Sequence, residues 1–317
     1  MIIRYAPVMS REWDTFVRES RNGSFLFLRK YMDYHSDRFR DHSLMYYDDK
    51  GRLLAVMAAN EKDGILCSHQ GLTYGGWILA DRVRTGDVGD MFSATMEYLA
   101  GLGFKEWYYK QMPTIYHCVP SQEDEYWLWR NGATIEQCLI SACIPIGTND
   151  SPDVERRRRR GLQRAMNCGY TIEYDATLED FWPVMVNNLR ERYDVAPVHT
   201  LEEMQLLKDR CSENIRCHIV RDDNGRAVAG CVLYDCNANV IHVQYGHATA
   251  EGKANGALDL LYLTLIEYYH NHSEKLFFDF GNSNEQGGKV LNNNLSQQKE
   301  GFGGRGVTYK LWKIKID

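Results

Sequence analysis

The strongest constraint on the fold is a pattern that occurs twice along the chain. One strand-like segment runs into Asp48–Arg52 (DDKGR), and a second runs into Asp222–Arg226 (DDNGR). The two runs are 174 residues apart (222 − 48), and the same offset pairs Gln70 with Gln244 at the end of the next predicted strand. In each run the glycine can supply the positive φ angle of a tight turn, so both segments are predicted to be β-hairpins.

The elements that follow each hairpin match as well. Amphipathic helices are predicted over residues 88–100 and 257–269, and strands follow at 106–109 and 276–279. The shared order and turn chemistry favour duplication of one unit. We therefore predict an α/β (α+β) fold of two tandem units, each with a mixed, mostly antiparallel sheet flanked by helices. The expected domains are residues 1–149 and 150–317, with the boundary near 148–152.

Composition narrows the class of protein. The 317 residues include 44% hydrophobic and 25% charged residues, enough for two medium-sized cores. No apolar run reaches the roughly 18 residues of a membrane helix, and no signal-peptide core follows Met1, so a cytoplasmic protein is expected. The net charge of −6 argues against a general nucleic-acid binder. Nine scattered cysteines without a C-x-x-C pair predict neither disulfides nor zinc.

Several familiar motifs can be excluded by their context. The run Gly301–Gly306 (GFGGRG) matches G-x-G-x-x-G, but an alternating strand pattern follows it instead of a helix. We expect its glycines to form a tight turn into the last strand. The run Ser283–Lys289 is a near miss to a P-loop, and the chain has no G-x-S-x-G. No ligand spacing suggests a catalytic metal.

Specific segments resemble a known family. The order strand, hairpin, strand, helix, strand resembles the GNAT superfamily of acyltransferases, and the tandem pair resembles its FemABX-like, Fem-type peptidyltransferase branch. The likeness is carried by Phe277–Gly304 (FFDFGNSNEQGGKVLNNNLSQQKEGFGG) and by Arg157–Tyr170 (RRRRGLQRAMNCGY). In the first half, residues 110–133 are similar to segments of bacterial acetyltransferases with this architecture. Unit one would then be a degenerate domain on the acceptor side, and unit two the donor side, with the last strand packing back on the first domain.

The resemblance implies a donor site at the start of the second predicted helix. Gly252 and Gly256 are expected to free a loop there, and a helix N-terminus binds phosphate through its free N–H groups. The GNAT pyrophosphate segment is present only in degenerate form, without its arginine and one glycine, so use of coenzyme A stays open. The donor residues we expect are Lys253, Asn255, Gly256, Ala257 and Leu258. The matching junction of the first half carries Asp87 and Asp90, which would repel a phosphate.

Acyl transfer also needs a general base and a hydrogen-bond donor that stabilises the oxyanion. Asp279 interrupts an apolar strand, where a buried carboxylate without a partner would be costly. We therefore expect it either to be paired, for example as a cap on the following turn, or to line a cleft. Lys299 matches the Fem-type lysine near the acyl donor, with a surface pair to Glu300 as the alternative. Tyr245 and His247 end the strand beside the donor site and could relay a proton, or be a core tyrosine and a surface histidine.

Two further groups of residues are singled out. Asn282 and Ser283, in the turn after Asp279, and Tyr116 and His117 in the first half are the candidates for binding the acceptor, although a structural histidine remains an alternative for His117. The five arginines Arg156–Arg160 lie on a predicted helix that ends before Gly169. They form either a solvated helix face or a patch that binds a phosphorylated ligand.

The leading expectation is an N-acyltransferase that moves an acyl group, such as acetyl, from an acyl-CoA to an amine of a small molecule, sugar or peptide, without a metal. One alternative is a Fem-type transferase that uses aminoacyl-tRNA to modify a cell-wall precursor. A second is a noncatalytic binding protein that kept the fold. DNA is not expected as a partner, and the sequence leaves the oligomeric state open.

Overall fold

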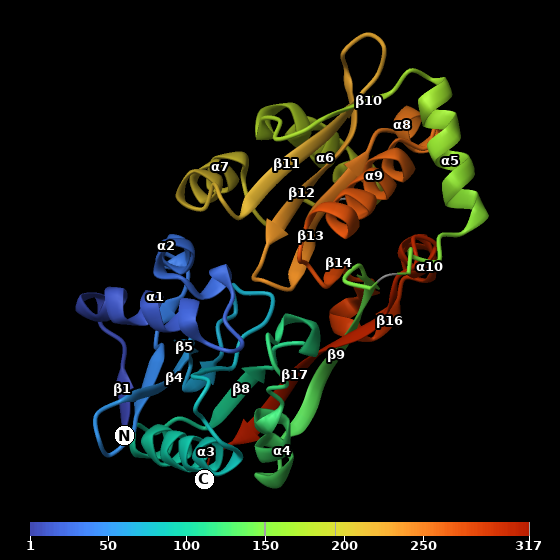
Figure 1. Cartoon of the computed structure of the whole chain (residues 1–317). Helices are drawn as coiled ribbons and strands as arrows, with labels where there is room; N and C mark the ends of the chain where they lie inside the picture. The colour runs from blue at the N-terminus through green and yellow to red at the C-terminus, as the bar shows by residue number, and fades with distance from the viewer. Residues whose placement is uncertain (149, 194, 317) are drawn as a thin grey trace. The chain divides into compact units, whose positions relative to one another are not determined.

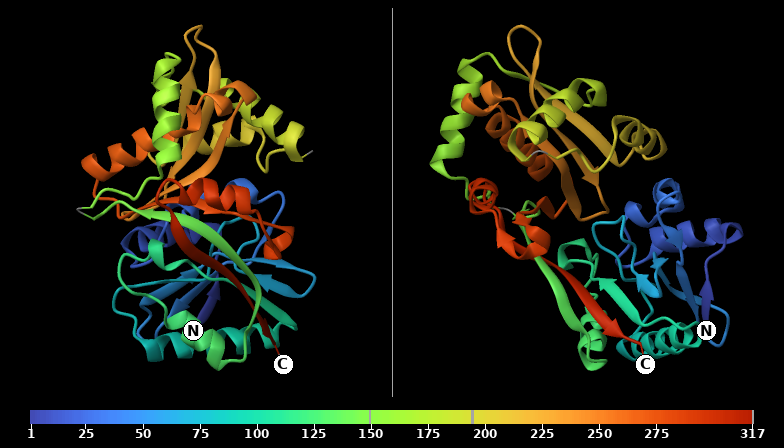
Figure 2. Two further views of the ribbon diagram at one scale, coloured as in Figure 1. Left: turned by 90° about the vertical axis from the view of Figure 1, so that its right-hand side faces the viewer. Right: turned by 180° about the vertical axis from the view of Figure 1, so that it is seen from behind.

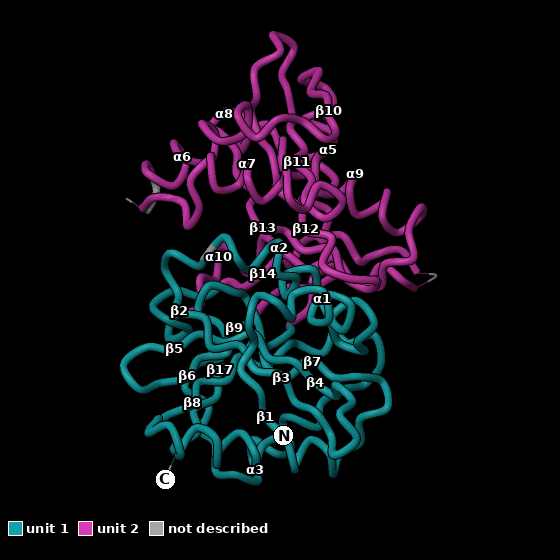
Figure 3. Tube along the Cα trace, turned by 90° about the vertical axis from the view of Figure 1, so that its left-hand side faces the viewer, with its two compact units in different colours: residues 1–140, 284–290, 307–317 teal, residues 141–283, 291–306 magenta. Residues whose placement is uncertain are grey.

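The chain forms two compact units. The computed structural model describes residues 1–148, 150–193 and 195–316. Unit 1 comprises residues 1–140, 284–290 and 307–317, and unit 2 comprises residues 141–283 and 291–306 (Figure 3). The chain therefore first leaves unit 1 within a strand, β9, and returns to it twice near the C-terminus. The division into domains at 149/150 stays a proposal, and Asn149 lies outside the described residues.

Unit 1 contains two sheets. The first is antiparallel with the order β1-β3-β4-β7, and the second has the order β9-β17-β8-β6-β5-β2 (Figure 1). Its helices are α1 (Ser10–Glu19), α2 (Arg29–Met32), α3 (Thr85–Gly101) and α4 (Glu123–Arg130). Its strands are β1 (Ile2–Arg4), β2 (Arg40–Asp41), β3 (Leu44–Tyr47), β4 (Leu53–Met57), β5 (Asn60–Lys62), β6 (Ile65–Cys67), β7 (Trp77–Leu79), β8 (Glu106–Lys110), the start of β9 (Thr134–Pro145) and most of β17 (Arg305–Lys315).

Unit 2 is built around one sheet with the order β10-β11-β12-β13-β14-β9. Helix α9 packs on one face of this sheet and α6 on the other, as the left-hand view of Figure 2 shows. Its helices are α5 (Arg156–Asn167), α6 (Leu178–Tyr193), α7 (Leu201–Arg210), α8 (Ala250–Ala254), α9 (Ala257–His272) and α10 (Asn293–Glu300). Its strands are β10 (Thr171–Glu173), β11 (Ile215–Arg221), β12 (Ala227–Asp235), β13 (Val240–Ala248) and β14 (Phe277–Asn282). Two short strands, β15 (Asn284–Glu285) and β16 (Val290–Leu291), pair with each other.

Both predicted hairpins are confirmed, and they share one turn chemistry. In β3–β4 the aspartate at the start of the turn bonds the arginine at its end, and Gly51 has a φ of 72°. In β11–β12 the Asp222 carboxylate bonds Arg226 in the same way, and Gly225 has a φ of 77°. Because φ is positive at both glycines, a residue with a Cβ would be strained there.

The duplication extends to the strands that follow. In unit 1, β6 runs parallel to β8, with Cys67 opposite Tyr108 at the end of the pairing. In unit 2, β13 runs parallel to β14, with His242 opposite Asp279 at the end of the pairing. A helix, α3 or α9, connects the members of each pair, as parallel strands require. Gln244 lies within β13, whereas Gln70 lies after the end of β6 and not on a strand.

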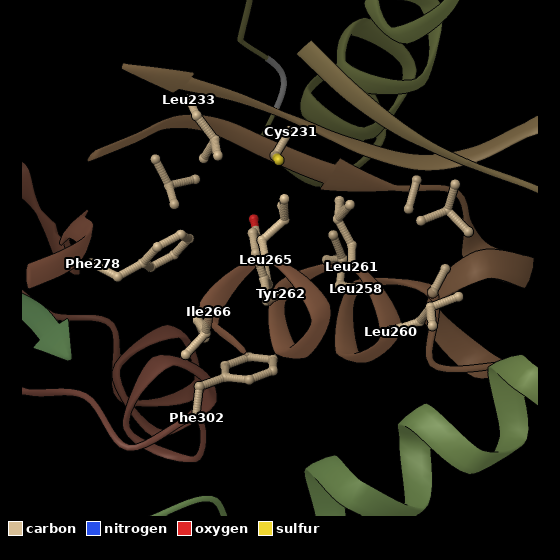
Figure 4. Close-up of a cluster of buried hydrophobic side chains, with 14 of the residues drawn as sticks. Cys231, Leu233, Leu258, Leu260, Leu261, Tyr262, Leu265, Ile266, Phe278 and Phe302 are labelled. Carbon is tan, nitrogen blue, oxygen red and sulfur yellow. The ribbon is translucent and has the colours of Figure 1, made fainter. Parts of the chain in front are cut away.

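The predicted apolar face of α9 forms the core of unit 2. Leu258, Leu261 and Leu265 point from the helix toward Cys231 and Leu233 of β12 (Figure 4). Tyr269 completes this face and is also buried. Burial of an apolar side chain of this size contributes roughly 1.5–3 kcal/mol, so this face anchors α9 to the sheet.

Of the two glycine-rich segments, one differs from its predicted structure and the other agrees with it. The loop expected before α9 is partly helical, because α8 spans Ala250–Ala254 with the Thr249 side chain accepting the Gly252 N–H. The turn expected before the last strand is confirmed: α10 ends at Glu300, Gly303 has a φ of 100°, and β17 begins at Arg305. None of the helices in the described part of the chain is both long and apolar enough to span a membrane.

One close contact in the unit 2 core gives a testable prediction. A Cβ added at Gly246 of β13 would lie 1.8 Å from the Tyr262 hydroxyl oxygen. We expect Gly246→Ala to destabilise the protein by about 1–3 kcal/mol, since the buried ring has little room to move. The double variant with Tyr262→Phe should recover part of this loss in urea unfolding. An additive or larger loss in the double variant would contradict the proposed clash.

Candidate functional site

The central strands of unit 2 part in the middle of the sheet. The pairing of β13 with β14 ends at His242 and Asp279, although β13 continues to Ala248. Just beyond this point Gln244 forms a bulge, because Val232 pairs with Tyr245 while Leu233 pairs with Val243. Bulges and parting strands interrupt the ladder and let a ligand approach the backbone. The candidate site therefore begins at the His242–Asp279 pair.

Asp279 is fully buried, with 0% of its surface exposed. One carboxylate oxygen accepts from the Ser141 hydroxyl and, at 3.2 Å, from the Gly281 N–H. The other lies 2.8 Å from Nδ1 of His242. These contacts offset the cost of burying the carboxylate, which would be several kcal/mol without partners. Asp279 thus caps the turn at Gly281 and also holds a histidine.

Lys299 of α10 reaches the same turn. Its ammonium donates to the carbonyl oxygens of Gly281 at 2.8 Å and Asn282 at 2.6 Å. Burial lowers the pKa of Lys299 to about 8, and the charge of Asp279 opposes this shift. An ammonium has three N–H groups, and these two carbonyls are its acceptors within the described part of the chain. The described hydrogen bonds therefore use two of its three N–H groups.

Unit 1 contains a comparable lysine with a different set of contacts. The Lys110 ammonium donates to three carbonyl oxygens, those of His69 at 3.3 Å, Gln70 at 3.1 Å and Leu72 at 2.5 Å. Burial lowers its pKa to about 8 as well. All three N–H groups are used, so Lys110 has the contacts of a structural lysine and is a natural control for Lys299.

Tyr245 and His247 share a face of β13 with His242. Ile241 and Val243 point into the core against α9, so His242 and, after the bulge, Tyr245 and His247 point to the opposite face. The Tyr245 hydroxyl lies 2.5 Å from Nδ1 of His199, and burial raises the pKa of Tyr245 to about 12.

On the same face, Nδ1 of His247 lies 3.1 Å from the Asn188 oxygen on α6. The structure therefore places Tyr245 and His247 in line with the Asp279–His242 pair, each with its own partner. It does not bring either of them into contact with Lys299 among the described hydrogen bonds.

A basic cavity of about 470 Å³ lies at the start of α9. Helix α5 lines one side and α10 another. The cavity is lined by Arg157, Arg158, Arg160, Arg164, Lys253, Gly256, Leu258, Asp259, Asn294, Gln297 and Gln298. Five cations against one carboxylate give this cavity a strongly positive lining, the kind that attracts an anion with several charges.

Some arginines of the cavity form ion pairs with carboxylates, and others do not within the described part of the chain. Arg158 binds Asp259 at 2.6 Å, which opposes the rise in the pKa of Asp259 caused by burial. Arg157 contacts Glu155 at 2.5 Å and the Gln297 carbonyl at 2.6 Å. Arg160 and Arg164 form no ion pair within the described part of the chain and are exposed toward the cavity. These two are the best placed to bind an added phosphate.

The predicted donor residues do not all reach this cavity. Lys253, Gly256 and Leu258 line it, whereas Ala257 is buried in the core. The N–H groups of Asn255 and Gly256 are used by the carbonyls of Glu251 and Lys253, so they are not open to a phosphate as expected.

Gly256 has a structural role in the packing of α5 on α9. Its φ is 82°, and a Cβ there would lie 2.3 Å from the Gly161 carbonyl oxygen. A bulky residue at 256 would therefore disturb the packing of α5 on α9.

The expected acceptor residues fall into two groups. Asn282 and Ser283 lie at the turn held by Lys299, and the Ser283 carbonyl accepts the Asn292 N–H at 2.9 Å. Tyr116 and His117 lie in unit 1, where both are buried. The Tyr116 hydroxyl is 3.0 Å from that of Tyr309, and burial lowers the pKa of His117 to about 4.

Sequence reasoning missed His242 and Ser141 and left the arginines undecided. His242 is one of several polar residues in a strand, and only the parallel pairing with β14 identifies its partner. The small residues Gly161 and Ala165, four apart on α5, mark the face that packs on α9 and could have shown which arginines remain open. In the described residues no group of three or more histidine, cysteine, aspartate or glutamate side chains could hold a metal ion.

Comparison with known proteins identifies the fold. Residues 153–286 match the model of the acetyltransferase (GNAT) domain. The crystal structure of FemX has a TM-score of 0.70 at 14% identity, covering 100% of this chain and 97% of FemX. L-PGS from Bacillus licheniformis has a TM-score of 0.61 at 13% identity, covering 99% of this chain and 93% of that one.

A tandem GNAT protein from the clavulanic acid biosynthesis pathway is also similar, with a TM-score of 0.55 at 12% identity, covering 100% of this chain and 98% of that one. A search of curated protein sequences finds no significant match. The match over residues 153–286 and the similarity to these solved structures bear out the expected fold of two tandem GNAT-like units.

Lys299, which is buried, and Lys110, which is half-buried, predict a common pH dependence of stability. Their folded pKa of about 8 lies below the ordinary 10.5, so the unfolded chain binds more protons between these values. Stability should therefore rise with pH in this window, by at most about 1.4 kcal/mol per pH unit for each lysine. Compared with wild type in urea unfolding, Lys110→Met should lose the share of this rise that Lys110 contributes and keep that of Lys299. Parallel pH profiles for the two proteins would contradict the lowered pKa.

Proposed function

We propose that this tandem GNAT protein is an acyltransferase that moves an acyl group from an acyl-CoA thioester, acetyl-CoA in the simplest case, to an amine. The observation that carries the proposal is the basic cavity between α5, α10 and the start of α9. The confirmed GNAT fold supports a transferase. We keep the expectation of a cytoplasmic location, with a small-molecule, sugar or peptide amine as acceptor.

The charge of the cavity fits the donor. Coenzyme A carries a pyrophosphate and a ribose phosphate, and charge-assisted bonds from guanidinium groups suit both. Arg160 and Arg164 supply open guanidinium groups on one side, and Lys253 adds a cation from α8. The first turn of α9 adds the positive end of a helix dipole. The arginine that the degenerate GNAT segment lacks is thus replaced by arginines of α5.

The side chains at the point where β13 and β14 part can carry out the chemistry of acyl transfer. Attack of the amine on the thioester carbonyl places negative charge on the carbonyl oxygen, and a donor fixed near this oxygen lowers the barrier. Lys299 is held by the carbonyls of Gly281 and Asn282 and keeps one N–H for the oxyanion. Asp279 is buried and fixes the turn, so we assign it a positioning role.

The Fem-type alternative uses the same cations for a different donor. A fold similar to FemX along the whole chain favours it, and the phosphates of an aminoacyl-tRNA would also be attracted by α5. The noncatalytic alternative would keep anion binding without transfer. A competition experiment between acetyl-CoA and aminoacyl-tRNA shows which donor binds. A transfer assay distinguishes an enzyme from a noncatalytic binding protein.

The open arginines give a direct test. We expect Arg160→Glu combined with Arg164→Glu to weaken acetyl-CoA binding on the order of 10²-fold in calorimetry, because two charge-assisted bonds are lost and repulsion is added. Arg159→Glu is the matched control. Arg159 lies on the same helix and is exposed, but does not line the cavity. Equal losses in the two proteins would place the donor elsewhere.

Lys299 gives the second test. Lys299→Met keeps the length of the side chain and removes the ammonium, so turnover should fall on the order of 10²-fold, the effect of one oxyanion donor. Lys110→Met removes a similarly buried ammonium from unit 1 and should lower the melting temperature while keeping turnover of the folded protein. Turnover and melting temperature should be measured together. Full turnover in Lys299→Met would clear this lysine of a catalytic role.

A further inference from the structure

A histidine that the sequence did not single out lies beside the buried carboxylate of unit 2. Nδ1 of His242 is 2.8 Å from Asp279, whose other oxygen accepts from Ser141 and Gly281. An ionised carboxylate only accepts hydrogen bonds, so the ring nitrogen that faces it carries the hydrogen. The lone pair of His242 is then on Nε2, the nitrogen turned away from Asp279.

The position of the ring matches the place where the strands part. His242 and Asp279 form the last paired rung of β13 and β14. A Cβ added at Gly281 would lie 3.2 Å from Cε1 and 3.7 Å from Nε2 of His242, so the ring edge packs against this glycine. The Gly281 carbonyl in turn holds the Lys299 ammonium. The imidazole and the ammonium therefore contact the same peptide segment.

Exposure decides which member of the pair can touch a substrate. Asp279 is 0% exposed, while His242 is 7% exposed. His242 also lies on the face of β13 that carries Tyr245 and His247, opposite the α9 core. Of the two paired side chains, only that of His242 has exposed surface.

We propose that His242 is the general base of the transfer, with Asp279 as its positioning residue. This inference rests on the acyl transfer proposed above. The amine nitrogen attacks the thioester carbon and forms the C–N bond, and Nε2 of His242 takes the proton that this nitrogen loses. Collapse of the tetrahedral intermediate breaks the C–S bond, and the proton passes to the leaving sulfur. The products are an amide and free coenzyme A, and His242 returns neutral.

Other titratable groups surround the pair. On β9, Cys143 pairs with Asp279, and burial raises its pKa so that it stays a neutral thiol. On α10, Lys299 has a pKa lowered to about 8. On β12, Tyr234 pairs with His242, and its hydroxyl is directed to the Met204 sulfur at 3.6 Å. Among the described hydrogen bonds, neither Cys143 nor Lys299 contacts the His242 ring.

The kinetic test uses His242→Gln, which keeps an amide donor toward Asp279. We expect kcat to fall about 10²- to 10³-fold with unchanged acetyl-CoA affinity. His218→Gln is the matched control, since His218 is also buried in unit 2, at 5% exposure, but lies on β11. Wild-type turnover in His242→Gln would overturn the proposal, as would an equal loss in both variants.

A second measurement does not depend on transfer. Nitrogen-15 spectra of the histidine rings should show His242 with its hydrogen on Nδ1, and Asp279→Asn should shift this tautomer. A hydrogen on Nε2 in the wild type at neutral pH would overturn the role of His242. A wild-type chain that binds no acetyl-CoA would instead refute the proposed donor, so the two failures are distinguishable.

Discussion

The structure of unit 2 depends on the buried carboxylate of Asp279. A carboxylate without solvent costs several kcal/mol unless hydrogen bonds replace the water. Here the replacements come from three directions: a hydroxyl on β9, the backbone of the turn at Gly281, and His242 on β13. One side chain thus ties together three neighbouring strands at the point where their ladder is broken. The strands can part there because the turn beyond them is fixed.

The phosphate site depends on a different constraint, the close approach of two helices. Gly161 of α5 and Gly256 before α9 meet so closely that a Cβ on Gly161 would lie 1.8 Å from the Asp259 carboxylate, and one on Gly256 would meet the Gly161 carbonyl. The Arg158–Asp259 pair closes this contact. Because α5 packs on α9 through Gly161 and Ala165, the arginines that directly precede them, Arg160 and Arg164, are left on the cavity side. The same packing that stabilises α5 therefore orients its charges.

The sequence predicted those parts of the fold that local chemistry determines. The two hairpins follow from an Asp-Asp-x-Gly-Arg turn, and α9 follows from leucines with helical spacing. Helix α8 was missed because two glycines suggested a loop, while the Thr249 cap that stabilises its first turn was overlooked. His242 could not be recognised because its partner is 37 residues away along the chain. Its importance follows from the parallel register of two strands, which no local pattern specifies.

The duplicated units also show how one arrangement can serve two purposes. Each unit places a buried lysine ammonium on backbone carbonyls near the end of its parallel strand pair. In unit 1 three carbonyls satisfy Lys110, and the position opposite Tyr108 is occupied by a thiol, Cys67. In unit 2 two carbonyls hold Lys299, and the corresponding position is occupied by an imidazole bound to a carboxylate. An ammonium whose three N–H groups all bind carbonyls stabilises a loop. An ammonium that binds two carbonyls and lies near a proton acceptor has the groups that acyl transfer requires. Within the described residues the two ammonium groups thus differ by one hydrogen bond, and this difference is our reason for assigning catalysis to unit 2.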